Sequence, residues 1–242
     1  ETALYVGFNN SSKHGDTIRV FTANSNSVTA VNDTDSVNED AAVTKTASQD
    51  DVLNDDSDPE SDSFSVTHIK KDGGTNSAVS SGTNNSNGTS VTGTYGTLVI
   101  GADGSYTYTA DQDAADDLDA NDTAPDTFVY TITDDHGATD TADLVITVTG
   151  VNDDPVAVND TDTVTADQSV SKSASQDDVM NDDSDPDDDD TFTVTHIKKS
   201  GGSNSTVSSS TTNADGTSVT GTYGVLTIGA DGSYTYNANN AD

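Results

Sequence analysis

The stretch that decides the fold is DTFVYTITDDHGATDTADLVITVTG, residues 126–150. Each half of it places an apolar side chain at every second position, and these residues are Phe128, Tyr130, Ile132, Leu144, Ile146 and Val148. The positions between them are mostly Thr or Val, which favour extended backbone. Alternation with a period of two is typical of a strand that is buried on one face. The stretch therefore predicts two strands joined by a turn near Asp134–Gly137.

The same pattern occurs earlier in the chain. Leu98–Ile100 and Tyr106–Tyr108 are separated by GADG, residues 101–104, whose Asp-Gly pair favours a tight hairpin turn. An equal turn stands at residues 229–232. The only candidate for a helix is the short stretch Asp113–Ala120. About seven or eight short strands in a unit of this size favour an all-β fold, an antiparallel β-sandwich of two sheets.

The chain repeats itself over long segments. Residues 30–59 and 157–186 are identical at 22 of 30 positions, and residues 66–108 and 194–236 are identical at 34 of 43. The offset is 127 residues for the first pair and 128 for the second. A spacing of this size corresponds to a whole domain, because solenoid repeats are only about 20–50 residues long.

The repeat suggests how the chain is divided. We expect the last hairpin of a preceding domain at 1–29, a complete repeat at 30–150, an acidic linker at 151–156, and a second repeat without its last two strands at 157–242. Thr2 and Tyr5 match Thr127 and Tyr130, and His14-Gly15 matches His136-Gly137. Two explanations stay open: the N-terminal hairpin completes the second repeat of another chain by strand donation, or the sequence is a window on a longer array.

Composition excludes several classes of function. The formal net charge is −35, and 40 of the 43 acidic residues are Asp, since the only Glu residues are Glu1, Glu39 and Glu60. Such a charge disfavours nucleic acid and anionic membranes as partners, and no apolar run is long enough to insert into a membrane. The absence of cysteine excludes disulfides and thiolate sites. The hydrophobic fraction of 30% is low, but the repeated strand pattern argues against disorder.

The motifs together resemble a known family. DDVLNDDSDP (residues 50–59), YGTLVIGADGSYTYT (residues 95–109) and residues 126–161 are similar to the bacterial tandem Ig-like or cadherin-like repeats, also called VCBS repeats, of large secreted RTX-type adhesins and biofilm proteins. The resemblance covers essentially residues 30–242. It implies an extracellular, calcium-stiffened stalk or adhesive repeat. Two features depart from the usual repeat: the polar insert at 73–93, and Glu60-Ser61-Asp62 or Asp187–Asp190 where Asp-Gly-Asp is common.

The acidic runs are candidate calcium sites. Calcium (Ca²⁺) binds six to eight oxygen atoms, and short carboxylates placed close together supply them. The candidate ligands in the runs are Asp55, Asp56, Asp58, Asp182, Asp183, Asp185, Asp187 and Asp189. The spacing is not that of an EF-hand, because the sixth position counted from Asp183 is Asp188 and not Gly. The alternative is a solvated acidic loop without an ion.

The linker VNDDPVAVND, residues 151–160, is a second candidate site. It looks like a cadherin linker, in which Asn and Asp residues hold calcium between successive domains. The candidate ligands here are Asn152, Asp153 and Asp154, joined by Asp134 and Asp135 from the hairpin turn. The alternative is a plain turn that ends at Pro155. The first junction, residues 23–33, lacks an acidic cluster, and we expect weaker calcium binding or none there.

These features predict a structural protein of the cell surface. We expect a calcium-stiffened stalk or fibre whose partners are calcium and copies of itself, either neighbouring repeats or subunits joined head to tail. A domain that binds cell-surface or matrix glycans is the alternative, although aromatic residues make up only 5% of the chain and Trp is absent. No nucleophile, metal-protease or phosphate-binding motif occurs, so we do not expect an enzyme.

Overall fold

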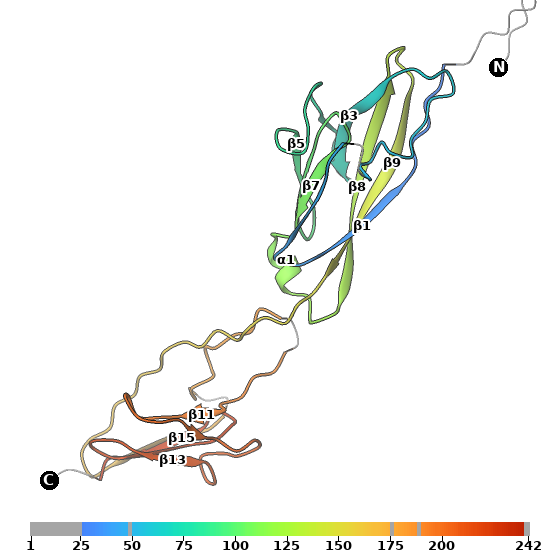
Figure 1. Cartoon of the computed structure of the whole chain (residues 1–242). Helices are drawn as coiled ribbons and strands as arrows, with labels where there is room; N and C mark the ends of the chain where they lie inside the picture. The colour runs from blue at the N-terminus through green and yellow to red at the C-terminus, as the bar shows by residue number, and fades with distance from the viewer. Residues whose placement is uncertain (1–25, 48–49, 175–176, 188–189, 240–242) are drawn as a thin grey trace, which may run out of the picture. The chain divides into compact units, whose positions relative to one another are not determined.

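The computed structural model describes residues 26–47, 50–174, 177–187 and 190–239 (Figure 1). Their contacts divide them into two compact units. Unit 1 holds the described residues up to Ala115 together with Asn121–Gly150, and unit 2 holds Asp116–Ala120 together with those from Val151 onward. Nearly all regular structure is β, which confirms the predicted all-β class. The hairpin expected within residues 1–29 lies almost wholly outside the described residues.

Unit 1 is a sandwich of two sheets. The first sheet has the strand order β1 (Asp33–Asn38), β9 (Thr139–Thr149), β8 (Thr123–Asp134), β3 (Phe64–Lys71) and β4 (Ser77–Ala78). The second has the order β2 (Ala42–Lys45), β7 (Tyr106–Thr109), β6 (Thr97–Ile100) and β5 (Thr89–Thr92). One helical turn, α1 (Asp113–Asp116), lies within the segment where a short helix was expected. The polar insert at 73–93 contributes β4 and β5.

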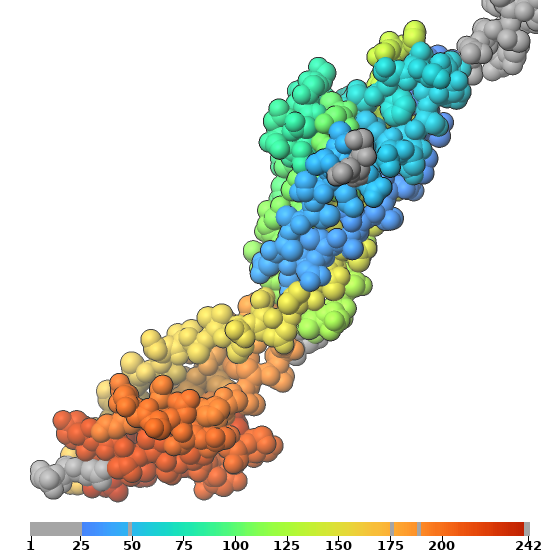
Figure 2. Space-filling view, in the orientation of Figure 1, coloured from blue at the N-terminus to red at the C-terminus, as the bar shows by residue number. Residues whose placement is uncertain are grey.

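The hairpin of β8 and β9 forms the centre of the first sheet. The two strands pair from Thr123 opposite Thr149 to Thr133 opposite Thr139. On its outer sides, β9 pairs with β1 in parallel and β8 pairs with β3 in antiparallel fashion. In Figure 2 the blue residues near β1 lie against the yellow residues near β9 on the visible face of unit 1. The four-strand core of this sheet therefore depends on the hairpin.

The hairpin also fills the core. The apolar residues predicted to share one face are all fully buried in the structure: Phe128, Tyr130, Ile132, Leu144, Ile146 and Val148. They meet the inward side chains of the second sheet, where the Tyr108 ring packs edge-on against Phe128 with ring centroids 6.0 Å apart. Aromatic pairs favour such edge-to-face contacts because the ring edge is positive and the face negative.

A bulge in β3 changes which side chains face the core. The pairing of β3 with β8 shifts between Val66 and His68. As a result Val66 and Ile69, three positions apart, both point inward and are 1% and 0% exposed. Simple alternation would have placed Val66 and His68 on one face. The displaced Thr67 hydroxyl lies 2.8 Å from the Thr133 hydroxyl on the neighbouring strand.

A buried carboxylate connects the two sheets of unit 1. Asp126 on β8 is 1% exposed. It accepts hydrogen bonds from the Tyr108 hydroxyl of β7 at 2.8 Å and from the backbone N–H groups of Thr94 and Tyr95 at 3.0 and 3.1 Å. Gly93 is required beside it, because an added Cβ would lie 2.0 Å from Asp126 Oδ2. One side chain on the central hairpin thus fixes the turn between β5 and β6.

Unit 2 repeats the second sheet of unit 1 but not the first. Its larger sheet has the order β10 (Ser169–Lys172), β15 (Tyr234–Asn237), β14 (Val225–Ile228) and β13 (Thr217–Thr220), matching β2, β7, β6 and β5. A short pair, β11 (His196–Ile197) and β12 (Ser205–Thr206), stands where β3 and β4 stand in unit 1. The described residues of unit 2 contain no counterpart of β8 or β9.

Replacement of Asp126 by Ala should destabilise unit 1 by about 3–5 kcal/mol in urea unfolding. The Tyr108 hydroxyl and two backbone N–H groups would lose their acceptor in a buried site, and each such loss costs about 1–3 kcal/mol. Tyr108→Phe removes one of these bonds and should cost about 1 kcal/mol. Asp122→Ala, a change at an exposed residue on the same segment, is the matched control and should stay within about 0.5 kcal/mol. An Asp126→Ala variant as stable as this control would contradict the assignment.

Candidate metal centres in the two units

In each unit, a two-residue bridge holds the acidic run beside the segment that enters the unit. In unit 1, Thr29 and Ser57 exchange backbone hydrogen bonds of 2.8 and 3.0 Å. In unit 2, Val156 and Ser184 exchange bonds of 2.7 and 3.1 Å. The runs continue directly from Ser57 and Ser184, and in unit 2 the Asp153 N–H of the entering segment bonds Asp187 of the run at 2.7 Å.

Three carboxylates meet at this end of unit 1. Asp58 and Asp62 come from the acidic run, and Asp134 comes from the last residue of β8. One oxygen of each lies within 4.8 Å of the others. Two ligands of a single calcium ion, each about 2.3–2.6 Å from it, are at most about 5 Å apart. The spacing therefore fits one shared hard cation.

In two of these carboxylates, backbone N–H groups bind one oxygen and leave the other free. Asp58 Oδ1 accepts the N–H groups of Glu60 and Asp62 at 2.8 and 3.1 Å. Asp134 Oδ1 accepts those of His136 and Ala138, both at 2.8 Å. Asp58 Oδ2 and Asp134 Oδ2 are buried and have no hydrogen-bond partner. A buried oxygen without a partner is costly, and a cation would satisfy both at once.

Asp134 is held in its charged form. Asp134 is only 6% exposed, and burial by itself would raise its pKa. The N–H groups of Ala138 and His136, and the Asn26 amide at 3.4 Å from Oδ1, outweigh this effect and lower the pKa. The charged form is the one that binds a metal ion. The hairpin turn therefore supplies a carboxylate that is ready to act as a ligand.

Unit 2 has a matching cluster. It consists of Asp185, Asp187 and Asp190, with one oxygen of each within 4.8 Å of the others. Asp187 is 3% exposed, and its Oδ1 has no partner. Its Oδ2 accepts the backbone N–H of Asp153, from the linker, at 2.7 Å. Asp187, from the acidic run, is thus the buried carboxylate of the cluster in unit 2, as Asp134 is in unit 1.

The structure brings together some of the predicted ligands. Asp58 lies with Asp134 in unit 1, and Asp185 lies with Asp187 in unit 2. The other predicted ligands that the structure describes are outside these two clusters: Asp55, Asp56, Asp135, Asn152, Asp153, Asp154, Asp182 and Asp183. Of these, Asp56 and Asp183 accept the N–H groups of Val31 and Val158 at 2.8 and 2.7 Å. Asp189 lies outside the described residues.

Sequence reasoning missed Asp62 and Asp190 as cluster members. The signal in unit 1 was the alternate spacing of Asp58, Glu60 and Asp62, which resembles the 1, 3, 5 spacing of ligands in calcium loops. The chain folds back there because Asp58 bonds the N–H groups of both later residues. Glu60 Oε2 is a further buried oxygen without a partner.

The expectation that Asp134 and Asp135 share an ion with the linker after Gly150 is wrong. The turn that carries them lies at the Thr133–Thr139 end of the hairpin, while Gly150 follows the Thr123–Thr149 end. Ten strand residues separate the two ends, about 33 Å at the usual rise. Asp134 lies instead beside Asn26, in the segment of unit 1 that precedes β1. The first junction therefore has carboxylates near it, although its own sequence is not acidic.

A second group of carboxylates surrounds the hydroxyl of Tyr130. This oxygen lies 2.7 Å from Val31 O, 2.9 Å from Asp33 Oδ2, 3.0 Å from Val52 O and 3.3 Å from Asp56 Oδ1. Burial, followed by the charge of Asp33, raises the pKa of Tyr130, so the hydroxyl keeps its proton. The single proton of the Tyr130 hydroxyl cannot be donated to four acceptors at once. A second proton, on one of the carboxylates, would reduce the repulsion between the oxygen atoms of this group.

Asp33 and Asp56 are the groups that can take up this proton. Burial, together with the charges of Asp55 and Asp56, raises the pKa of Asp33 to about 7. Burial likewise raises the pKa of Asp56 to about 6. An unfolded aspartate has a pKa of about 3.9. Between about pH 4 and pH 7 the folded unit therefore binds protons that the unfolded chain has released, so stability falls as the pH rises.

Comparison with known proteins identifies one family. The family model described as "Bacterial cadherin-like domain" matches residues 24–150, which is more than half of the chain. A search of curated proteins finds no match. Within the described residues, no helix has the length and apolar character needed to cross a membrane.

Replacing Asp33 with Asn should make unit 1 less sensitive to pH. The amide resembles the protonated carboxyl group, so the variant should lose less of its melting temperature between pH 5 and pH 7.5 than the unchanged chain. The comparison is made in chelator so that metal binding does not contribute. Asp40→Asn, at an exposed residue just after β1, is the control and should keep the pH dependence. An equal pH slope in the Asp33→Asn variant would show that this group does not hold the proton.

Proposed function

Because the chain belongs to the bacterial cadherin-like domain family, we propose that it is a calcium-stiffened structural segment of an extracellular adhesive protein. Proteins built from such domains are typically extracellular, and the domains generally bind calcium. The finer proposal is a stalk or fibre of a VCBS-type adhesin of the bacterial surface or biofilm matrix. The tandem repeat supports it, since two similar units follow one another in one chain.

One observation carries the calcium proposal. Asp134 and Asp187 each bury an unpartnered carboxylate oxygen within a cluster of three carboxylates. The donors are all carboxylate oxygens, the chemistry that calcium prefers over softer metals. Asp58, Asp62 and Asp134 would hold the ion in unit 1, and Asp185, Asp187 and Asp190 in unit 2. The ion supplies two positive charges that offset the repulsion among these groups.

Calcium would stiffen the repeat at the point where a linker meets a unit. Asn26 donates a hydrogen bond to Asp134, and the Asp153 N–H bonds Asp187, so each cluster contacts the residues that lead into its unit. An ion that fixes Asp134 or Asp187 also fixes these contacts. A chain with a formal net charge of −35 otherwise favours extended, separated conformations.

A structural role accounts for the features better than glycan binding. Sugar-binding faces usually offer exposed aromatic rings, and Tyr223, 72% exposed, is the one aromatic among the large apolar residues that the described surface exposes. The carboxylate clusters, in contrast, recur in both units. The fold is a structural and adhesive one, and we propose that its task is to span distance.

Replacement of Asp134 by Asn should abolish the gain in thermal stability that calcium gives to unit 1. The change keeps the shape of the side chain but removes a charged ligand, so calcium affinity should fall at least about tenfold. In the unchanged chain, calcium at about one hundred times its dissociation constant should add about 2.7 kcal/mol to the free energy of unfolding. Calorimetric melting and isothermal titration, each with calcium and with chelator, measure these effects.

The matched control is Asp135→Asn, which alters the exposed neighbour of Asp134 outside the cluster. It should bind calcium like the unchanged chain. Asp187→Asn tests unit 2 in the same way and should leave the transition of unit 1 unaffected. If Asp134→Asn and Asp135→Asn bind calcium equally well, the cluster is not the site. If millimolar calcium stabilises neither unit of the unchanged chain, the proposed function is wrong.

A further inference from the structure

The carboxylates of the first sheet in unit 1 face its interior. Strands β1, β8 and β9 carry two Asp residues each, and five of these six alternate in phase with the buried apolar residues. Three of the five bind tyrosine hydroxyls, and the other two bind backbone N–H groups. They are Asp33, Asp35, Asp126, Asp134 and Asp140. Most of the charge that these strands carry is therefore absent from the outer face of the sheet.

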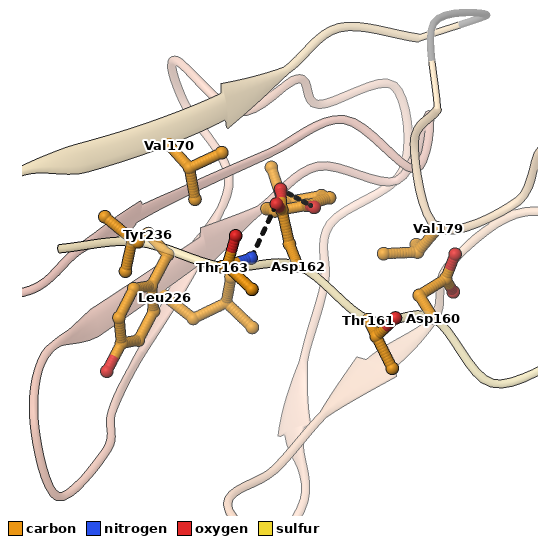
Figure 3. Close-up of a pocket in the computed structure, with 10 residues that line it drawn as sticks. Asp160, Thr161, Asp162, Thr163, Val170, Val179, Leu226 and Tyr236 are labelled. Carbon is orange, nitrogen blue, oxygen red and sulfur yellow. Dashed lines mark hydrogen bonds between the residues drawn. The ribbon is translucent and has the colours of Figure 1, made fainter.

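Unit 2 uses one of these carboxylates in the same way. Asp162, the counterpart of Asp35, accepts a hydrogen bond from the Tyr234 hydroxyl at 2.8 Å, and Figure 3 shows this carboxylate with its bonds. In unit 1, the Tyr106 hydroxyl donates to Asp35 at 2.9 Å. Because the bond recurs in both units, the inward direction of this carboxylate is a feature of the repeat.

The outer face of the first sheet consists mainly of small neutral side chains. Eight of the twelve outward positions of β8 and β9 are Thr, two are Val, one is Pro125 and one is Asp143. Val129 and Thr131, near the middle of the face, are partly exposed. In a chain with 43 acidic residues, a second copy can approach this face with little electrostatic repulsion.

Two opposite charges lie in one row across this face. Lys70 on β3 is opposite Val129 on β8, and Val129 is opposite Asp143 on β9. The two charged residues are therefore separated by two strand spacings, about 10 Å. Neither forms an ion pair within the described residues, whereas Lys45 pairs with Asp35 at 3.4 Å. The face thus has a cation on one side of Val129 and an anion on the other.

We propose that this face is an interface between two copies of the chain, which pack face to face about a two-fold axis that runs along β8. The rotation exchanges the β3 side of the face with the β9 side. Lys70 of one copy then meets the partner's Asp143, and Asp143 of the first copy meets the partner's Lys70. Such a contact is isologous and self-complementary, as a closed dimer requires. The Thr and Val side chains between the two ion pairs pack as in stacked sheets about 10 Å apart.

The face is large enough for a specific dimer. The ladder of β8 and β9 has 11 residue pairs, which is about 36 Å of strand. The four strands β1, β9, β8 and β3 span about 19 Å at the usual spacing. Two copies would therefore bury at most roughly 1,400 Å² in total, within the range of about 1,200–2,000 Å² that specific interfaces bury. Since the face is flat and rich in Thr, we expect affinity in the micromolar range.

The outer face of the second sheet suits such a contact less well. Its strands have four residues each, about 13 Å, so this face is much shorter. The one charged residue in these strands, Lys45, already pairs with Asp35 inside unit 1. The row of Lys70 and Asp143, in contrast, sets both the orientation and the register of a partner.

Sedimentation velocity of the 242-residue chain at about 0.15 M salt tests the proposal. We expect a monomer–dimer equilibrium in the unchanged chain. Lys70→Asp places two carboxylates opposite each other at the interface, twice over, and should raise the dissociation constant at least about tenfold. Asp143→Lys should do the same with two amines. Lys71→Asp and Asp122→Lys are the matched controls, because they change the charge equally away from the row, and they should leave the equilibrium within about threefold.

Mixing the two failing variants gives the sharper result. Neither variant associates well with itself, but an equal mixture of Lys70→Asp and Asp143→Lys chains restores both ion pairs and should form a heterodimer. A chain that carries both substitutions should also recover self-association to within about threefold. Urea unfolding of each variant confirms that unit 1 is folded, which is expected because both side chains point outward from partly exposed positions.

Three results would overturn the proposal. The first is an unchanged chain that stays monomeric up to about 1 mM, the weak end of specific association. The second is a dimer that Lys70→Asp and Asp143→Lys weaken no more than their controls, which would assign association to another surface. The third is the absence of a heterodimer in the mixture of folded variants. The interface contains no residue of the carboxylate clusters, so runs in calcium and in chelator should agree, and a failure of calcium binding would contradict the proposed function alone.

Discussion

The hairpin of β8 and β9 is the element on which the rest of unit 1 depends. One face of β8 presents Asp126, Phe128, Tyr130, Ile132 and Asp134 inward, and all five are buried. The apolar members fill the core, where the hydrophobic effect favours them. The polar members bind loops: Asp126 holds the β5–β6 turn, Tyr130 holds the segments at Val31 and Val52, and Asp134 faces the acidic run. A single strand therefore positions the loops at both ends of the sandwich.

This arrangement couples the candidate ion site to the fold. Asp134 is the last residue of β8, and its geometry is set by N–H groups of the turn that joins β8 to β9. A calcium ion there would bind only the folded hairpin, so binding energy would add to folding energy. The cluster in unit 2 is built differently, because its buried carboxylate, Asp187, belongs to the acidic run itself. The two sites thus differ in what holds the buried carboxylate, although both use an Asp-rich sequence.

Much of the fold could be predicted from the sequence, because the alternation of apolar and polar side chains along a strand is visible within a few residues. The strands at residues 98–100, 106–108, 128–132 and 144–148 follow directly from it. The bulge at Thr67 could not be predicted, since the motif VTHIKK gives no sign that Val66 and Ile69 share a face. The acidic runs were recognisable as cation ligands, but their grouping depends on contacts between distant residues. Asp58 meets Asp134 across 76 positions of sequence, and Asp62 joins them through a turn that Asp58 itself closes.

The hairpin of β8 and β9 closes the sandwich in unit 1, whereas the described residues of unit 2 have no such hairpin and leave the matching side chains partly exposed. Hydrogen exchange of the dilute chain in chelator tests this most directly, because β6–β7 and β14–β15 are nearly identical in sequence. We predict that the amides of Leu98 and Tyr108 exchange much more slowly than those of Leu226 and Tyr236. Equal protection of the two pairs in a monomeric sample would contradict it, because unit 2 would then be closed without a hairpin.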